Sequence, residues 1–207
     1  MQKLVLSLCL MVMIIQVDGQ KKKDATDEDV KKAYLSIPKV DGNYEYMEVV
    51  TLDTSWKKDD LYKNAKLFFT DEFRSAKDVL QYDDRNEGKI VGKGVTKILG
   101  GQGVFLNYFT DTRYVNFTLE VFCKDGRYRY RIYNIYSDGI TTASGGSSGT
   151  STNTVNGQSV DAQYEMTKKG ITKKMDRQLF VDMVHSIESI IADLKADMSK
   201  RVASNDF

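Results

Sequence analysis

The sequence predicts one small α+β domain built on an antiparallel sheet, and three patterns carry this prediction. Residues 113–123 alternate apolar and polar side chains, as a half-buried strand does. Asp125-Gly126 is a strong signal for a two-residue hairpin turn into the next strand. Two stretches, 54–74 and 173–201, carry apolar residues at helical spacing. A hydrophobic content of 41% is sufficient for one core.

The first 19 residues have the pattern of a secretory signal peptide. Lys3 precedes an apolar run over residues 4–17, and Gly19 supplies the small residue that signal peptidase reads. This run is shorter than the ~20 residues that a membrane-spanning helix needs. Cys9 lies in the middle of the run, where no lipid attachment is expected. We therefore expect cleavage after Gly19 and export to the periplasm or the cell surface, without a membrane span.

After the signal peptide, the sequence predicts an N-terminal arm, a strand, a helix and four further strands. A polar N-terminal arm over residues 20–43 contains one helical stretch, 27–35. A β-rich stretch, 44–50, predicts the first strand. An apolar stripe over 61–73 then predicts an amphipathic helix that ends near Arg74. Four strands joined by hairpins follow it, over residues 77–83, 89–99, 113–123 and 127–136.

Glycine-rich stretches interrupt this pattern twice. Gly92 and Gly94 lie on one face of their strand, which predicts a sharp bend or a close contact there. Residues 100–109 form a connection without a clear element. Residues 141–159 are rich in Gly, Ser, Thr and Asn, so we expect a flexible loop. The final helix ends the domain, which spans 44–201, and residues 202–207 form a tail.

Four stretches together resemble a known family. These are Lys58–Phe69, Ser75–Asp84, Gly88–Gly94 and the hairpin Lys124–Tyr130. They are similar to an exported Bacteroidetes family of unknown function with a TATA-box-binding-protein-like (TBP-like) fold. The resemblance implies a curved antiparallel sheet of about five strands in the order β-α-β-β-β-β-α, with two helices packed on one face. It implies no function, and a fold shared with a DNA-binding protein does not imply DNA binding.

The composition excludes several classes of function. Lys and Arg number 30 and Asp and Glu number 29, so no global attraction to nucleic acid is expected. Once Cys9 has left with the signal peptide, Cys123 is the one remaining cysteine, and we expect it to be a buried strand residue. His185 lies opposite the apolar stripe of the last helix and should face solvent. We therefore expect no zinc site, no other cofactor and no catalytic set.

The candidate binding residues are Arg127, Arg129, Arg131 and Tyr133, which share one face of a strand because side chains alternate with a period of two. Three guanidinium groups on an open face suit an anionic glycan or an acidic envelope protein. The alternative is that these arginines pair with acids on neighbouring strands, such as Glu120. For function, the sequence thus favours a non-catalytic binding module. It leaves open a carboxylate-dependent hydrolase, for example one acting on glycans, whose acids converge only in the fold.

Overall fold

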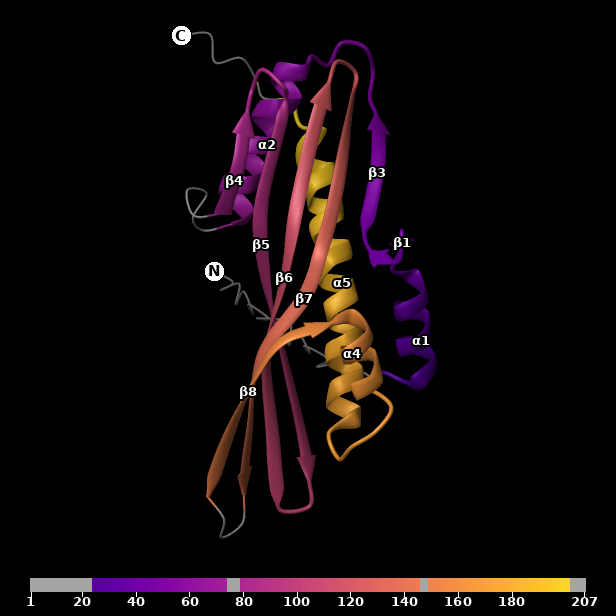
Figure 1. Ribbon diagram of the computed structural model, residues 1–207, viewed down its shortest axis with the longest axis vertical. Helices are drawn as coiled ribbons and strands as arrows, with labels where there is room; N and C mark the ends of the chain where they lie inside the picture. The colour runs from indigo at the N-terminus through magenta and orange to yellow at the C-terminus, as the bar shows by residue number, and fades with distance from the viewer. Residues whose placement is uncertain (1–23, 74–78, 146–148, 202–207) are drawn as a thin grey trace, which may run out of the picture.

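The structure is a computed structural model that describes residues 24–73, 79–145 and 149–201 (Figure 1). Four helices lie within these residues: α1 (Asp27–Ser36), α2 (Lys58–Glu72), α4 (Val160–Met166) and α5 (Lys173–Met198). The strands are β1 (Lys39–Val40), β2 (Asn43–Tyr44), β3 (Tyr46–Thr51), β4 (Leu80–Asp84), β5 (Lys89–Val104), β6 (Asn107–Lys124), β7 (Arg127–Gly145) and β8 (Thr150–Ser159).

Six strands form one antiparallel sheet in the order β3-β7-β6-β5-β4, with β8 also paired to β7. Strand β7 is long enough for two neighbours on its outer edge. β3 pairs with its first part, residues 127–132, and β8 pairs with its second part, residues 136–144. Between these two partners, no described strand pairs with residues 133–135 on that edge.

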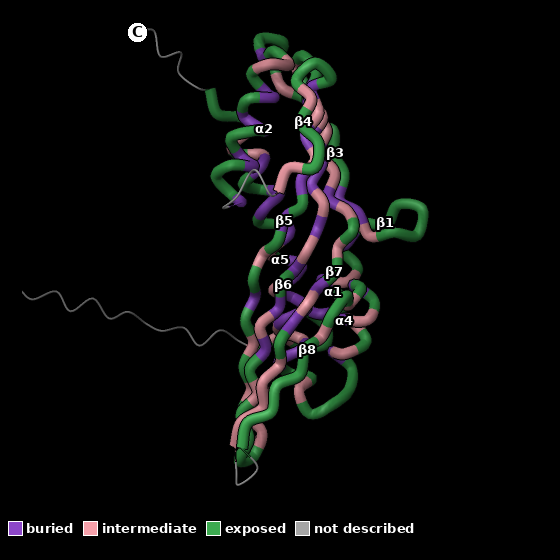
Figure 2. Tube along the Cα trace, turned by 60° about the vertical axis from the view of Figure 1, so that its left-hand side comes forward, coloured by how far each residue is buried: buried purple, intermediate pink, exposed green. Residues whose placement is uncertain are grey.

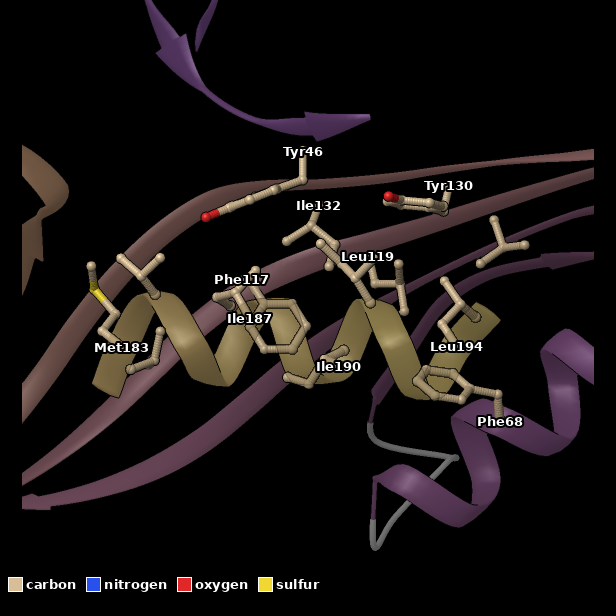
Figure 3. Packing of buried hydrophobic residues seen from close by; sticks show 14 of the residues in the cluster. Tyr46, Phe68, Phe117, Leu119, Tyr130, Ile132, Met183, Ile187, Ile190 and Leu194 are labelled. Atoms are coloured by element: carbon tan, nitrogen blue, oxygen red, sulfur yellow. The ribbon is translucent and has the colours of Figure 1, made fainter. Parts of the chain in front are cut away.

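Helices α2 and α5 cover one face of this sheet (Figure 1). The apolar stripe of α5 supplies Ile187, Ile190 and Leu194, which lie against Phe117, Leu119 and Ile132 of the sheet (Figure 3). Alternation along the strands places these sheet residues on the covered face and their neighbours on the opposite face. The other face, called the open face below, carries partly exposed side chains along most of its length (Figure 2).

Glycines in β5 let the phenylalanines of α2 approach the sheet closely. A Cβ added at Gly92 would lie 2.6 Å from the Phe69 ring, and one at Gly94 would lie 2.3 Å from Phe117 and 2.9 Å from Phe73. The rings of Phe73 and Phe117 meet edge to face with their centroids 6.1 Å apart. The close contact predicted at this glycine pair is therefore present.

The expected order β-α-β-β-β-β-α is confirmed by β3, α2, β4 to β7 and α5. The flexible loop expected over residues 141–159 is wrong: residues 141–145 continue β7, and residues 150–159 form β8. Composition misled here because Thr is a good strand former and the hairpin needs no apolar side chain when most of it is exposed. The unassigned connection, 100–109, completes β5, a turn and the start of β6.

The expected N-terminal arm packs against the domain from residue 24 onward. The Thr26 side chain caps α1 in a capping box with Asp29, and Val30 and Ala33 are buried in the contact between α1 and α5. The Tyr34 ring stacks on Tyr164 of α4 at 3.9 Å between centroids. The helical stretch expected over 27–35 is confirmed, and it belongs to the fold.

The signal peptide expected over residues 1–19, residues 74–78 and the tail expected over residues 202–207 lie outside the described residues. In the described ranges, no helix combines the length and the apolarity that crossing a membrane requires.

The close contact at Gly94 can be tested by substitution. Gly94→Ala should lower the free energy of unfolding by about 1–3 kcal/mol, because the added methyl overlaps two rings in a packed core. Urea unfolding measures the change. Gly103→Ala in the same strand is the control, since its Cβ would meet its nearest neighbour at 3.9 Å. Equal effects of both substitutions would contradict the packing described here.

Candidate functional site

The open face carries all four candidate residues. Arg127, Arg129 and Arg131 alternate along β7 with Tyr128, Tyr130 and Ile132, which are buried beneath α5 and its neighbours. Arg127 is exposed, whereas Arg129, Arg131 and Tyr133 are half-buried. The strand therefore presents the arginines on the face that the sequence predicts, but it surrounds each of them differently.

Arg129 forms an ion pair across the sheet with Glu120 of β6. Its Nη2 lies 2.8 Å from Glu120 Oε1, and Lys89 Nζ lies 3.3 Å from Glu120 Oε2. The Glu120 side chain is only 9% exposed, so two cations neutralise one buried carboxylate. The alternative that the arginines pair with cross-strand acids is correct for Arg129. One atom of this guanidinium, Nε, is buried without a hydrogen-bond partner among the described residues.

Arg131 is held more firmly by Glu45, which directly precedes β3. The guanidinium donates two hydrogen bonds, of 2.5 Å from Nε and 2.7 Å from Nη2, to the Glu45 carboxylate. It also lies over the Tyr133 ring at 4.5 Å from the centroid. The hydrogen bonds from Arg131 hold the pKa of Glu45 below its ordinary value. Two of the three nitrogen atoms of the Arg131 guanidinium are therefore engaged by Glu45.

Arg127 contributes to a separate, basic site. We call it the basic hollow: a depression of about 180 Å³ lined by Val49, Phe122, Lys124, Arg127, Tyr128 and Arg129. The Lys124 ammonium lies 5.2 Å and the Arg129 guanidinium 5.8 Å from the centroid of the Phe122 ring. None of the described residues that line the hollow is acidic. Among the residues described, no carboxylate lies within ion-pair distance of Lys124 or Arg127.

Register explains why these cations meet. Lys124 and Arg127 are directly opposite across the Asp-Gly turn, and Phe122 is opposite Arg129. Val49 of β3 is opposite Arg129 on its other side. Residues opposite each other in an antiparallel pair share a face and lie about 5 Å apart. The sheet thus places Lys124 and Arg129 against the Phe122 ring, with Arg127 in the same lining.

A second hollow lies where no described strand pairs with the outer edge of β7. This edge pocket, of about 430 Å³, is lined by residues that include Tyr44, Glu45, Arg131, Tyr133, Asn134 and Asp161. Asp161 accepts hydrogen bonds from the hydroxyls of Tyr34 and Tyr44. These bonds hold the pKa of Asp161 below its ordinary value, as Arg131 does for Glu45. Both carboxyl groups are therefore ionised at neutral pH.

The structure thus divides the predicted set between two places. Arg127 and Arg129 line the basic hollow, whereas Arg131 and Tyr133 line the edge pocket. The sequence pattern alone did not predict Lys124 and Phe122 as site residues, although the Asp-Gly turn fixes the register that brings them to Arg127 and Arg129. It also missed the pairing of Glu45 with Arg131, since nothing local in the sequence links residues that lie 86 positions apart.

Cys123 and His185 have the burial that the sequence predicts. Cys123 is 1% exposed, and burial raises the pKa of its thiol to about 12, so the thiol is unreactive. His185 is exposed on α5. No group of three or more potential metal ligands is present in the described part of the chain.

Comparison with known proteins adds a family to this geometry. Residues 46–137 match the family described as a domain of unknown function (DUF4468) with TBP-like fold. Residues 46–137 of the chain are thus similar to a DUF4468 domain. The matched range runs from the start of β3 to the middle of β7 and includes every residue that lines the basic hollow. No curated protein matches the chain.

Two solved structures are similar to the chain as a whole. One is a TBP-like protein from Parabacteroides distasonis, with 13% identity and a TM-score of 0.51 over 80% of this chain and 99% of that one. The other is a DUF4468 family protein from Bacteroides ovatus, with 15% identity and a TM-score of 0.47 over 81% of this chain and 92% of that one. The first likeness supports the TBP-like fold of the DUF4468-like domain.

The pair between Glu45 and Arg131 predicts a pH-dependent contribution to stability. Glu45→Gln should cost about 1–2 kcal/mol at neutral pH, because the substitution leaves the Arg131 charge without its counter-ion. The folded-state pKa of Glu45 lies below its ordinary value of 4.5, so the wild-type advantage is present above that pH. It should disappear as pH falls through the folded-state pKa.

Urea unfolding of both proteins between about pH 3 and pH 7 measures this difference. Glu188→Gln, at an exposed position of α5, serves as the control and should change little at any pH. A Glu45→Gln penalty that stays constant over this range would show that the carboxylate charge is not responsible.

Proposed function

We propose that the DUF4468-like domain of this chain is an exported, non-catalytic binding module whose basic hollow takes an anionic group. The observation that carries this proposal is the lining of the basic hollow: Lys124 and Arg127 lie beside Phe122 and Arg129, and no described residue of the lining is acidic. Arg129 is paired with Glu120 outside the lining, so Lys124 and Arg127 supply the charge for a ligand. The half-buried guanidinium groups of Arg129 and Arg131 have ion-pair partners in the protein, whereas Lys124 and Arg127 are exposed to solvent. Lys124 and Arg127 have no ion-pair partner among the described residues, so they are available to a ligand.

The dimensions of the basic hollow restrict the ligand. About 180 Å³ is less than the 300–1,000 Å³ typical of small-molecule sites, so the hollow suits one charged group of a larger molecule. The Arg127 guanidinium can bind a carboxylate, sulfate or phosphate with two parallel hydrogen bonds. The Phe122 ring and Val49 offer apolar contact to the carbon atoms that bear such a group. An acidic glycan or an acidic segment of an envelope protein has both features.

The edge pocket supports the hydrolase alternative less well. Glycoside hydrolysis needs one carboxylic acid that keeps its proton near neutral pH, which requires a raised pKa. Glu45 and Asp161 both have lowered pKa values, and both are already bound by side chains of the protein. Neither group can donate a proton at neutral pH. The side chains of the open face therefore fit a binding function better than glycoside hydrolysis.

Substitution in the basic hollow tests the binding function. Arg127→Gln and Lys124→Gln should each weaken binding to polygalacturonate, dextran sulfate or polyphosphate by about fivefold to fiftyfold, because each removes a charge-assisted hydrogen bond. Thermal melting should change little, since neither side chain is in an ion pair within the described protein. Binding is measured by affinity electrophoresis and calorimetry at two salt concentrations.

The matched control is Lys97→Gln, which removes an exposed cation from the same face outside the hollow. It should leave affinity nearly unchanged. If Lys97→Gln weakens binding as much as Arg127→Gln does, the attraction comes from the whole face and the hollow is not a site. If the wild type binds none of the three polymers, the proposal fails. The intact mass of protein from the native envelope, beginning at Gln20, tests the export component separately.

A further inference from the structure

An uncharged arm projects from the end of the sheet that is remote from α2. It consists of the ends of β5 and β6 with their turn, and of the neighbouring parts of β7 and β8, which extend beyond α4 and α5 (Figure 1). Gln102 is the last β5 residue held by the helical layer, through hydrogen bonds with the backbone of Ile171 and Met175. Beyond it, the β5–β6 turn carries Phe105 and Leu106, which we call the tip.

The tip exposes two large apolar side chains to solvent. Phe105 has a relative exposure of 102% and Leu106 one of 78%. Tyr108, which is 52% exposed, is the second residue of β6 and packs across the β5 glycines: a Cβ at Gly101 would be 2.6 Å from its hydroxyl. A Phe-Leu pair in water at the end of an arm contributes nothing to the core of the fold.

The backbone at the tip is also unfavourable for the residue that occupies it. Phe105 has φ +58°, a conformation that Gly or Asn adopts readily and that bulky side chains rarely adopt. Val104 pairs with Asn107, so the turn has two central residues, a position where Gly, Asn or Asp is usual. Folding would therefore favour Gly or Asn at this position. Strain at an exposed residue points to a use outside the folding of the chain.

Charge is missing from the arm in a chain that is 29% charged. Residues 99–110 and 139–160 contain no Asp, Glu, Lys or Arg. The strands behind the tip consist mainly of Gly, Thr, Ser and Asn residues, and Leu99, Tyr108 and Ile140 are exposed on them. Interfaces between proteins are enriched in Arg, and residues 99–110 and 139–160 contain none.

We propose that the tip inserts into the surface of a lipid bilayer. Phe105 and Leu106 would enter the boundary between head groups and acyl chains, with Tyr108 at head-group level, where aromatic rings with a polar end are favoured. An uncharged arm meets no desolvation penalty for ionised groups as it approaches the membrane. The absence of Lys and Arg predicts that attachment depends on apolar burial and not on anionic lipid.

The depth of insertion is limited by the strands. The outer edge of β8 has no strand partner among the described residues, and unpaired backbone groups are costly in hydrocarbon. Val104 and Asn107 pair with each other at the β5–β6 turn, but the outer edge of β5 beyond Gly92 also has no strand partner among the described residues. Only the tip can therefore enter the apolar layer, and two side chains at this depth give weak, reversible attachment.

A vesicle-binding experiment with phosphatidylcholine tests the proposal. The chain from Gln20 onward is used, because it retains every described residue and lacks the apolar leader. Wild-type protein should sediment with the vesicles to the same extent at about 0.1 M and about 1 M salt, although the Debye length falls from ~10 to ~3 Å. Phe105→Asn should reduce partitioning about tenfold or more, because it removes the larger apolar side chain.

The melting temperature of Phe105→Asn distinguishes membrane binding by Phe105 from a structural role of this residue. Phe105→Asn should leave the melting temperature unchanged or raise it, because Asn fits the positive φ better. Leu35→Gln replaces an equally isolated residue that is 70% exposed on α1, and it should leave partitioning unchanged. Loss of both partitioning and stability in Phe105→Asn would overturn the proposal.

Two other results would also overturn it. Sedimentation that needs anionic lipid and disappears at high salt would assign membrane attachment to the basic face. A concentration-dependent dimer in analytical ultracentrifugation, lost in Phe105→Asn, would assign the tip to a second copy of the chain. The basic hollow is tested separately, because polymer binding through Arg127 is measured without lipid.

Discussion

The burial of one sheet face under α2 and α5 is the constraint on which the rest of this structure depends. Every strand alternates, so the decision about which face is buried also determines which side chains remain outside. Tyr128, Tyr130 and Ile132 lie beneath the helices, and the arginines between them are therefore exposed on the open face. The basic hollow results from this burial, since the same register that forms the core places its cations.

Close contact between α2 and the sheet depends on the absence of side chains at two glycines of β5. Phe69 and Phe73 reach the sheet because Gly92 and Gly94 have no Cβ to exclude them. At the other end of the domain, the sheet continues past the helices and has no core to cover. The uncharged arm is stabilised there by strand pairing alone, which is why its side chains can be small, polar or fully exposed.

The sequence predicts the covered part of the fold well and the uncovered part poorly. Apolar periodicity identifies α2, α5 and β6 because burial on one side selects those side chains. The same rule fails for β8, which has no buried face and therefore has the composition of a loop. Register limits the site in a similar way. The partner of Lys124 follows from a two-residue turn, whereas the partner of Arg131 depends on β3 pairing with β7 across the chain.

Alkylation of single cysteines tests the one-sided cover most directly. In the chain from Gln20 onward, Cys123 is the sole thiol and faces the helices, and Lys93→Cys adds a thiol on the open face of β5. In native protein at about pH 8, iodoacetamide should modify the added thiol at the rate of a free thiol and leave Cys123 unmodified until the protein unfolds. Rapid modification of Cys123, or protection of the thiol introduced by Lys93→Cys, would contradict a sheet covered on one face only.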